Sequence, residues 1–243
     1  MYHDVYLNNI LESGFQRDCD LPYKLQASFF EEQVKQCAEY CKERGLPNDT
    51  IVFTFDDGGK SFYSVAAPIL DKYGYKGVFF ISSKYIGTPT FLTEEDIIAL
   101  HKSGHIIGSH AHSHEHLYEL SDDEVEYEWK ESIRILSGII GSKVVYASIP
   151  NGDLSKRVLK YTSKHGIKYL YTSEPTTAIR KYKGMDLIGR YVILSNTTTE
   201  EVLSIIRSAN KRRILLLKRK FLKLVKFVLG GRYEKIKNSL FKK

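Results

Sequence analysis

The sequence lacks the features of an exported or membrane-spanning protein. Its opening, from Met1 to Val5, contains no basic segment followed by an apolar one, so we expect no secretory signal. No stretch of about twenty residues is apolar and uncharged, which predicts no transmembrane helix. Only three cysteines are present, and Cys37 and Cys41 have no second pair to complete a metal site. We therefore expect reduced structural thiols and a cytoplasmic protein.

Positive charge is scarce outside the C-terminal end. The 243 residues have a formal net charge of +7, but residues 211–243 contain thirteen Lys or Arg and one acid, Glu234. Residues 1–210 contain 23 bases and 28 acids, so the body of the chain is mildly acidic. No internal repeat or low-complexity linker divides it. We expect one catalytic domain over residues 1–197 and a basic helical tail over 198–243.

Short apolar runs alternate with longer amphipathic stretches along the chain. Predicted strands cover 51–55, 77–81, 106–109, 144–148, 168–172 and 187–193, and predicted helices cover 28–44, 61–74, 93–103, 121–140, 153–165 and 198–229. Thr93 and Ser121 each precede a run of acids, which is typical of a helix N-cap. This alternation predicts an α/β fold with a parallel sheet, closed as a barrel or open.

Polar side chains follow the predicted strands at their carboxyl ends. Asp56 and Asp57 follow the first strand, the histidine-rich segment 110–116 the third, and residues 150–152 and 173–175 the fourth and fifth. In a parallel barrel these ends share one rim, where active sites are built. We therefore expect these residues to lie together.

Two adjacent carboxylates after a buried strand require a compensating positive charge or a proton. An Asp-Asp-Gly sequence is also a common surface turn. Six of the eight histidines lie between His101 and His116, however, and one Asp with two histidines spaced His-x3-His can hold a divalent metal. Spacing alone does not choose between His110 with His114 and His112 with His116.

These residues resemble a known family. The segments Thr54-Phe55-Asp56-Asp57-Gly58 and 108–114 (Gly-Ser-His-Ala-His-Ser-His) are similar to the first two motifs of polysaccharide deacetylases, carbohydrate esterase family four with its NodB-like domain. The resemblance extends from about residue 2 to residue 191 and is greatest to members from lipopolysaccharide or capsule biosynthesis. It implies a distorted (β/α) barrel and metal-dependent removal of an N-acetyl group from a sugar.

The resemblance also implies roles for individual residues. Asp56 matches the general base, Asp57 the metal-binding aspartate, and His110 and His114 the metal-binding histidines. A site with two histidines, one aspartate and an open position suits Zn²⁺ best, with Co²⁺, Ni²⁺ or Mn²⁺ as alternatives.

Two family motifs are missing. Ser148 stands where the family has the arginine that orients the base, and the usual Leu-x-His that supplies the general acid is not evident. We expect Arg190 to replace the arginine if its strand ends near Asp56, and His3 or His116 to act as the acid. The alternative for His3 is that it is a buried structural histidine. The alternative for Arg190 is that it forms an ion pair with an acid at the surface. Five rim residues are expected to contact substrate: Ser148, Pro150, Asn151, Gly152 and Glu174.

The leading hypothesis is a deacetylase of an amino sugar in surface polysaccharide (O-antigen or capsule) biosynthesis, acting on an N-acetylated glycan or lipid-linked sugar. One alternative is a hydrolase of another C–N amide bond. The other is an inactive glycan-binding or assembly protein, which the intact ligands and base argue against because burying two adjacent carboxylates is costly.

The basic tail contains an amphipathic helix pattern. Its apolar stripe consists of Ile214, Leu217, Phe221, Leu224, Val225 and Val228, and its basic side consists of Lys218, Arg219, Lys220, Lys223 and Lys226. This helix can pack its stripe on the barrel or lie against an anionic membrane at the inner face. Nucleic-acid binding would also account for the charge, but a deacetylase gives it no support, so we expect no nucleic-acid partner.

Overall fold

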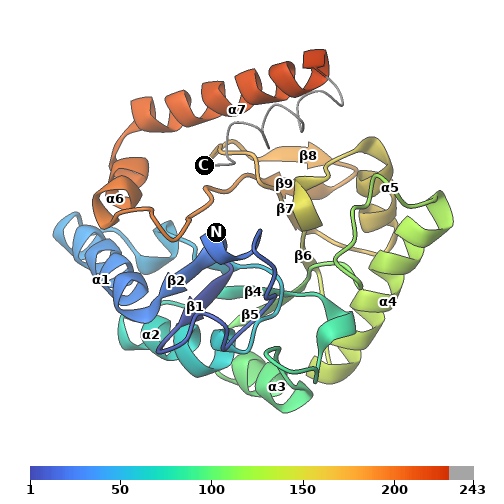
Figure 1. The fold of residues 1–243 in the computed structure, drawn as a ribbon, viewed down its shortest axis with the longest axis horizontal. Coiled ribbons are helices and arrows are strands. Elements are labelled where there is room, and N and C mark those ends of the chain that lie inside the picture. Colours follow the sequence, from blue (N-terminus) through green and yellow to red (C-terminus); the bar gives the residue numbers. More distant parts are fainter. Residues whose placement is uncertain (230–243) are drawn as a thin grey trace.

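Strands occupy the middle of the molecule and helices surround them (Figure 1). The computed structural model describes residues 1–229. Within them one curled sheet has the strand order β3 (Thr54–Phe55), β4 (Val78–Ile81), β5 (Ile106–Ser109), β6 (Tyr146–Ser148), β7 (Tyr169–Tyr171), β9 (Met185–Ile188) and β8 (Arg180–Tyr182). All neighbours are parallel except the edge pair of β8 and β9. The predicted α/β class and distorted barrel are confirmed.

The helices that connect the parallel strands pack on the outside of the sheet. They are α1 (Ala27–Glu43), α2 (Ala67–Lys72) after a π-helical turn (Phe62–Ala66), α3 (Glu94–Lys102), α4 (Asp122–Ile140) and α5 (Lys156–Lys164). Short 3₁₀ turns lie at Leu21–Tyr23, Asn48–Thr50, Ser83–Tyr85 and Pro150–Gly152. Thr93 and Ser121 both form capping boxes, as their sequence contexts predict.

The N-terminal residues close the sheet on its open side. Strand β1 (Asp4–Tyr6) pairs in parallel with β2 (Lys24–Gln26), and neither β2 nor β8 was predicted. The Tyr2 amide donates to the Thr54 carbonyl at 2.8 Å, and the Tyr2 carbonyl accepts from the Asp56 amide at 3.1 Å. On its other side, the Met1 carbonyl accepts from the Ile193 amide at 3.0 Å. The N-terminal segment therefore connects β3 with the segment that follows β9.

Aromatic side chains fill the core beneath this closure. Phe55 lies 5.0 Å from Phe79 and 5.5 Å from Tyr2 between ring centroids, and all three are buried. Burying such a side chain contributes roughly 1.5–3 kcal/mol of transfer free energy. Packing thus holds β3, β4 and the N-terminus together at the level just below the rim.

The prediction of a single helix over 198–229 is wrong. The structure has two helices, α6 (Thr199–Arg207) and α7 (Ala209–Leu229), separated by Ser208, whose φ of −112° and ψ of 112° are extended. Helix α6 packs on α1 and buries Val202 and Leu203, so tertiary packing fixes its direction independently of α7.

Four residues of the predicted apolar stripe of α7 face outward instead of packing on the barrel. Ile214, Leu217, Phe221 and Leu224 are each about 60% exposed. The Arg212 guanidinium donates to the carbonyls of residues 205 and 206, which directs the opposite side of α7 toward the domain. The predicted tail beyond residue 229, and the side chains of Lys223, Lys226 and Val228, lie outside the described residues. None of the described helices is long and apolar enough to cross a bilayer.

Candidate active site

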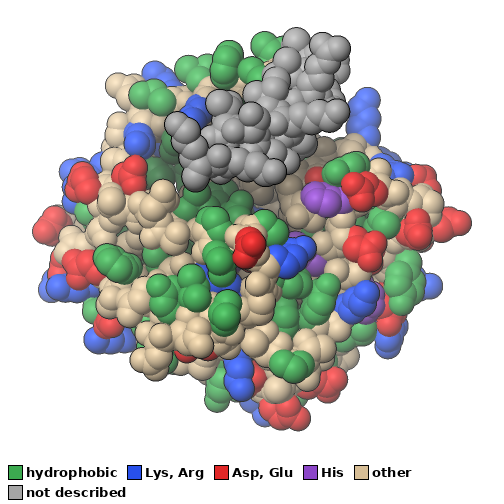
Figure 2. Space-filling model, in the orientation of Figure 1, with side chains coloured by type: hydrophobic (Ala, Val, Ile, Leu, Met, Phe, Trp, Pro, Cys, Tyr) green, Lys and Arg blue, Asp and Glu red, His purple; other side chains and the backbone are tan. Residues whose placement is uncertain are grey.

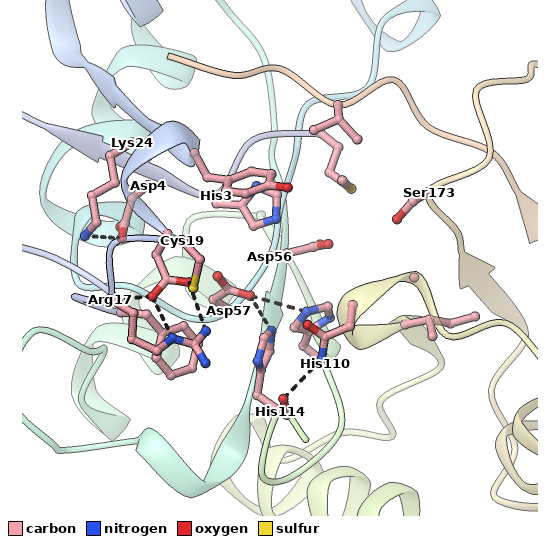
Figure 3. Close-up of a pocket in the computed structure, with 18 of the residues that line it drawn as sticks. His3, Asp4, Arg17, Cys19, Lys24, Asp56, Asp57, His110, His114 and Ser173 are labelled. Carbon is pink, nitrogen blue, oxygen red and sulfur yellow. Dashed lines mark hydrogen bonds and ion pairs between the residues drawn. The ribbon is translucent and has the colours of Figure 1, made fainter. Parts of the chain in front are cut away.

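The polar residues expected at the rim surround a cavity of about 480 Å³ at the carboxyl ends of the strands. Figure 3 shows His3, Asp56, Asp57, His110 and His114 gathered around this space, which we call the catalytic pocket. They come from the N-terminus, the end of β3 and the loop after β5. Residues far apart in sequence therefore meet where the parallel strands end.

Asp57, His110 and His114 form a compact group of potential metal ligands. Their ligand atoms all lie within 4.8 Å of one another, and Asp57 Oδ1 is 3.3 Å from His110 Nε2 and 3.1 Å from His114 Nε2. Tetrahedral ligands at roughly 2.1 Å from a metal would be about 3.4 Å apart. Asp57 Oδ1 is buried yet has no hydrogen-bond partner among residues 1–229. This donor set fits a divalent metal.

The hydrogen bonds of His110 fix its tautomer. Ser148 Oγ lies 3.1 Å from Asp56 Oδ1, which can only accept, so the hydroxyl donates there. The same oxygen lies 2.5 Å from His110 Nδ1 and therefore accepts the Nδ1 proton. This assignment leaves the lone pair of His110 on Nε2, facing Asp57, as metal coordination requires.

The charges around Asp57, His110 and His114 favour binding of a positive ion. Burial alone would raise the pKa of Asp57, but the adjacent His110 and His114 hold its pKa well below the usual range. Burial alone would lower the pKa of His114, but the Asp57 carboxylate raises it overall. An ionised carboxylate is therefore maintained where a cation would bind.

Asp56 forms a buried two-pronged ion pair with Arg190. Arg190 Nη1 donates to Asp56 Oδ1 at 2.6 Å and Nη2 to Oδ2 at 2.8 Å, and both residues are at most 5% exposed. The guanidinium also contacts the rings of Phe80 and Tyr171. Burial alone would raise the pKa of Asp56, but Arg190 and, less strongly, His110 lower it to about 2. The contact expected if Arg190 replaced the missing arginine is present, and the surface ion pair is excluded.

The two adjacent carboxylates point in different directions because of the backbone of Asp57. Its φ of 88° is positive, a conformation that non-glycine residues seldom adopt. Asp56 thereby faces Arg190 and Ser148, while Asp57 faces the two histidines. The turn lets consecutive residues serve two separate functions.

His3 lies in the wall of the catalytic pocket, just before β1. Its ring is 4.5 Å from that of Tyr23, and its buried Nδ1 has no hydrogen-bond partner in the part of the chain that the structure describes. Burial lowers the pKa of His3, against the opposing charges of Asp57 and Asp56. A structural histidine would normally have its ring nitrogens paired, so this environment favours a role toward a ligand.

The other histidines of the cluster lie apart from the metal ligands. His112 Nδ1 is 2.9 Å from Ser83 Oγ, so the structure selects His110 with His114 over His112 with His116. His116 lines the outer part of the pocket, where its Nδ1 is 3.1 Å from Asp153 Oδ2 and its side chain is 47% exposed.

Of the residues predicted to contact substrate, two lie in the wall of the catalytic pocket. Asn151 and Gly152 line the pocket. Ser148 and Pro150 are buried and do not, because Ser148 turns inward to Asp56 and His110. Glu174 does not line the pocket either, and its backbone carbonyl accepts from the Arg190 amide at 2.9 Å.

Sequence reasoning missed Glu128, which organises the loop that holds the histidines. Its carboxylate accepts from the amides of His112 and Ser113, both at 2.8 Å, and from the Ser113 hydroxyl at 2.7 Å. The available signal was its position on the buried face of α4, between Val125 and Trp129. A carboxylate on an apolar helix face requires partners.

Comparisons with known proteins agree with this geometry. The family model for polysaccharide deacetylases matches residues 43–170, just over half of the chain. Bacillus subtilis YxkH, whose name assigns it provisionally to the polysaccharide deacetylases, is 31% identical over 165 residues, 68% of this chain and 56% of that protein. A chitin deacetylase of Arthroderma benhamiae is 36% identical over 118 residues, 46% of this chain and 30% of that protein. The chain thus spans about half, or less, of the length of these relatives.

Solved structures show the same fold. A Streptococcus pyogenes deacetylase, PplD, in complex with acetate matches with a TM-score of 0.69 and 20% identity, over 85% of this chain and 96% of that chain. BC0361, a polysaccharide deacetylase from Bacillus cereus, matches with a TM-score of 0.67 and 22% identity, over 85% of this chain and 67% of that one. At such identities the likeness concerns the fold.

We predict that Asp57→Asn, His110→Gln and His114→Gln each weaken binding of a divalent metal by at least about tenfold, because each removes a ligand. Metal content measured by mass spectrometry after dialysis against a metal buffer tests this. His112→Gln, which changes a neighbouring imidazole bonded to Ser83, should retain the wild-type content. Equal metal retention in all four variants would show that the cluster is not a metal site.

Proposed function

The chain belongs to the polysaccharide deacetylase family, and we propose that it hydrolyses an N-acetyl group on an amino sugar, releasing acetate and a free amine. The observation that supports this most directly is the group Asp57, His110 and His114 beside the Asp56–Arg190 pair, in one open pocket. Hydrolysis of an amide needs an activated water and a polarised carbonyl, and this arrangement can supply both.

We propose that Asp57, His110 and His114 hold the metal, and that it is zinc, since two imidazoles and one carboxylate suit that ion. A divalent metal held there would supply a Lewis acid that makes water more acidic and polarises a carbonyl. Asp56 would accept the proton of the attacking water. A carboxylate with a pKa of about 2 is a weak base, but Arg190 keeps it ionised and aimed, which suffices when the water is acidified.

We propose His3 as the acid that protonates the departing amine nitrogen. It lines the same pocket, and its Nδ1 has no hydrogen-bond partner among residues 1–229. The lowered pKa of His3, caused first by burial, makes its protonated form a stronger proton donor. His116 is the alternative, but it lies farther out and is paired with Asp153.

The proposed substrate is an N-acetylated sugar in surface polysaccharide biosynthesis, of the O-antigen or capsule type, presented on a lipid at the cytoplasmic face of a membrane. Helix α7 supports this proposal. Residues 209–229 contain eight Lys or Arg and no acid, and Ile214, Leu217, Phe221 and Leu224 are exposed. Figure 2 shows hydrophobic side chains along the edge of the molecule where α7 runs in Figure 1. Such a helix binds anionic interfaces.

We predict that the metal-loaded protein releases acetate from at least one member of a panel of N-acetylated glycans. Asp56→Asn should slow this release by about 10²–10⁴-fold, because it removes the base. Its metal content should stay at the wild-type level, since Asp56 is not a ligand. Loss of metal in that variant would mean that the two aspartates have the opposite roles, and no acetate from any substrate would contradict the proposed activity.

We predict that His3→Gln lowers kcat by about 10²–10⁴-fold with little change in KM or metal content, as expected for removal of a general acid. His116→Gln is the matched control and should keep most of the wild-type kcat. If the loss of activity follows His116 and not His3, the acid is assigned to the wrong residue.

We predict that full-length protein floats with vesicles containing phosphatidylglycerol. The double variant Leu217→Gln/Phe221→Gln should bind at least about tenfold more weakly, because each substitution removes a large apolar side chain from the interface. Leu7→Gln/Leu11→Gln changes two leucines that are about half exposed elsewhere and should bind normally. Equal flotation of all three proteins, or of none, would exclude α7 as a membrane anchor.

A further inference from the structure

A second cavity, of about 340 Å³, lies between α7 and the segment that follows β9. We call it the α7 cavity. On the side of α7 its lining residues are Lys211, Leu215, Lys218, Arg219 and Leu222. Ser173, Val192 and Arg219 line both this cavity and the catalytic pocket. The two spaces are therefore neighbours that share a wall.

The α7 cavity has unpaired positive charge. Lys211, Lys218 and Arg219 form no ion pair with any residue in 1–229, and the buried Arg219 Nε has no hydrogen-bond partner there. The acid in the lining, Glu201, already accepts from the Thr198 amide at the start of α6. The positive side chains at the cavity thus lack an anionic partner among the described residues, and ammonium and guanidinium groups bind anions by charge-assisted hydrogen bonds. The cavity is therefore suited to an anion.

The rest of the lining combines polar residues with an aliphatic part formed by Val192, Ile205, Leu215 and Leu222. A free sugar or a carboxylated glycan would leave these side chains without apolar partners. A phosphate joined to a hydrocarbon chain satisfies both parts of the lining, because guanidinium and ammonium groups bind phosphate and the aliphatic side chains bind the hydrocarbon. The chemistry of the cavity thus indicates an amphiphile with a phosphate head.

The position of Arg219 relates this head to the reaction site. A Cβ added at Gly152 would lie 3.6 Å from Arg219 Nη2, so the guanidinium reaches the turn after β6 at the edge of the catalytic pocket. We propose that the α7 cavity binds the phosphate and adjoining apolar chain of a lipid-linked sugar, with Arg219 holding the phosphate. The identity of the sugar end rests on the proposed function, whereas the phosphate and chain sites rest on the cavity itself.

Binding of farnesyl diphosphate, measured by calorimetry below its micelle concentration with the full-length protein, tests the proposal without needing activity. Wild type should bind it more tightly than inorganic diphosphate or farnesol. Arg219→Gln should weaken binding of farnesyl diphosphate by at least about tenfold. Leu215→Gln should weaken binding of farnesyl diphosphate but not of inorganic diphosphate.

The matched control is Arg213→Gln, which removes an exposed arginine of α7 that lines neither cavity. It should bind farnesyl diphosphate like wild type, and all variants should melt within a few degrees of it. Equal weakening by Arg213→Gln and Arg219→Gln would show general attraction to a basic helix and overturn the proposal. Inorganic diphosphate binding as tightly as farnesyl diphosphate would reduce the cavity to a simple anion site, which also overturns it.

A kinetic comparison separates this proposal from the proposed function. Acetate release is measured from farnesyl-diphospho-N-acetylglucosamine and from methyl N-acetylglucosaminide. Arg219→Gln should raise KM at least about tenfold more for the first substrate than for the second, because only the first carries a phosphate. An equal effect on both would assign Arg219 to the sugar and overturn the proposal. If wild type deacetylates neither substrate, the proposed function fails while the calorimetric result still decides the ligand of the α7 cavity.

Discussion

A buried ion pair joins two distant parts of the chain: Arg190, just after β9, donates both terminal nitrogens of its guanidinium to the carboxylate of Asp56 at the end of β3. Removing both charges from water is costly, and the pair is stable only with further partners. Thr54 Oγ1 and the Thr172 carbonyl accept from the same guanidinium, and two aromatic rings cover it. This interaction holds together the two sides of the curled sheet and also keeps the carboxylate of Asp56 ionised. The Asp56–Arg190 ion pair therefore both closes the fold and fixes the position of Asp56 in the site.

The local part of the site was predictable from the sequence. Asp56, Asp57 and the histidine cluster are signalled by residue type and spacing, and the family resemblance chose His110 with His114. Ser148 illustrates the limit: its sequence position suggested a substrate contact, but its hydroxyl lies between Asp56 and His110, an arrangement that depends on the register of three strands. Arg219 could not be assigned to the pocket either, because the direction of α7 depends on the extended backbone at Ser208 and on contacts of Arg212 with α6. Long-range packing decided these positions, and no short sequence pattern encodes it.

Helix α7 presents different chemistry on its two sides. Large apolar side chains face away from the domain, whereas Lys211, Lys218 and Arg219 face the cavity beside the catalytic pocket. An isolated sequence pattern would describe this helix only as basic and amphipathic. Placed beside the rim of the barrel, the same pattern separates an exposed apolar surface from basic side chains that line a cavity. The direction of α7 relative to α6 decides which side of the helix faces the domain. This separation is therefore a property of the fold.

The backbone at position 57 limits which amino acids can occupy it. A φ of 88° disfavours most side chains, and Gly, Asn and Asp are those that tolerate a positive φ best. The neighbouring imidazoles require an anionic oxygen at the same place. Glycine and asparagine meet the first condition alone, and glutamate meets only the second, so the two conditions together leave aspartate. A search for functional variants at this position would therefore find almost no neutral substitutions.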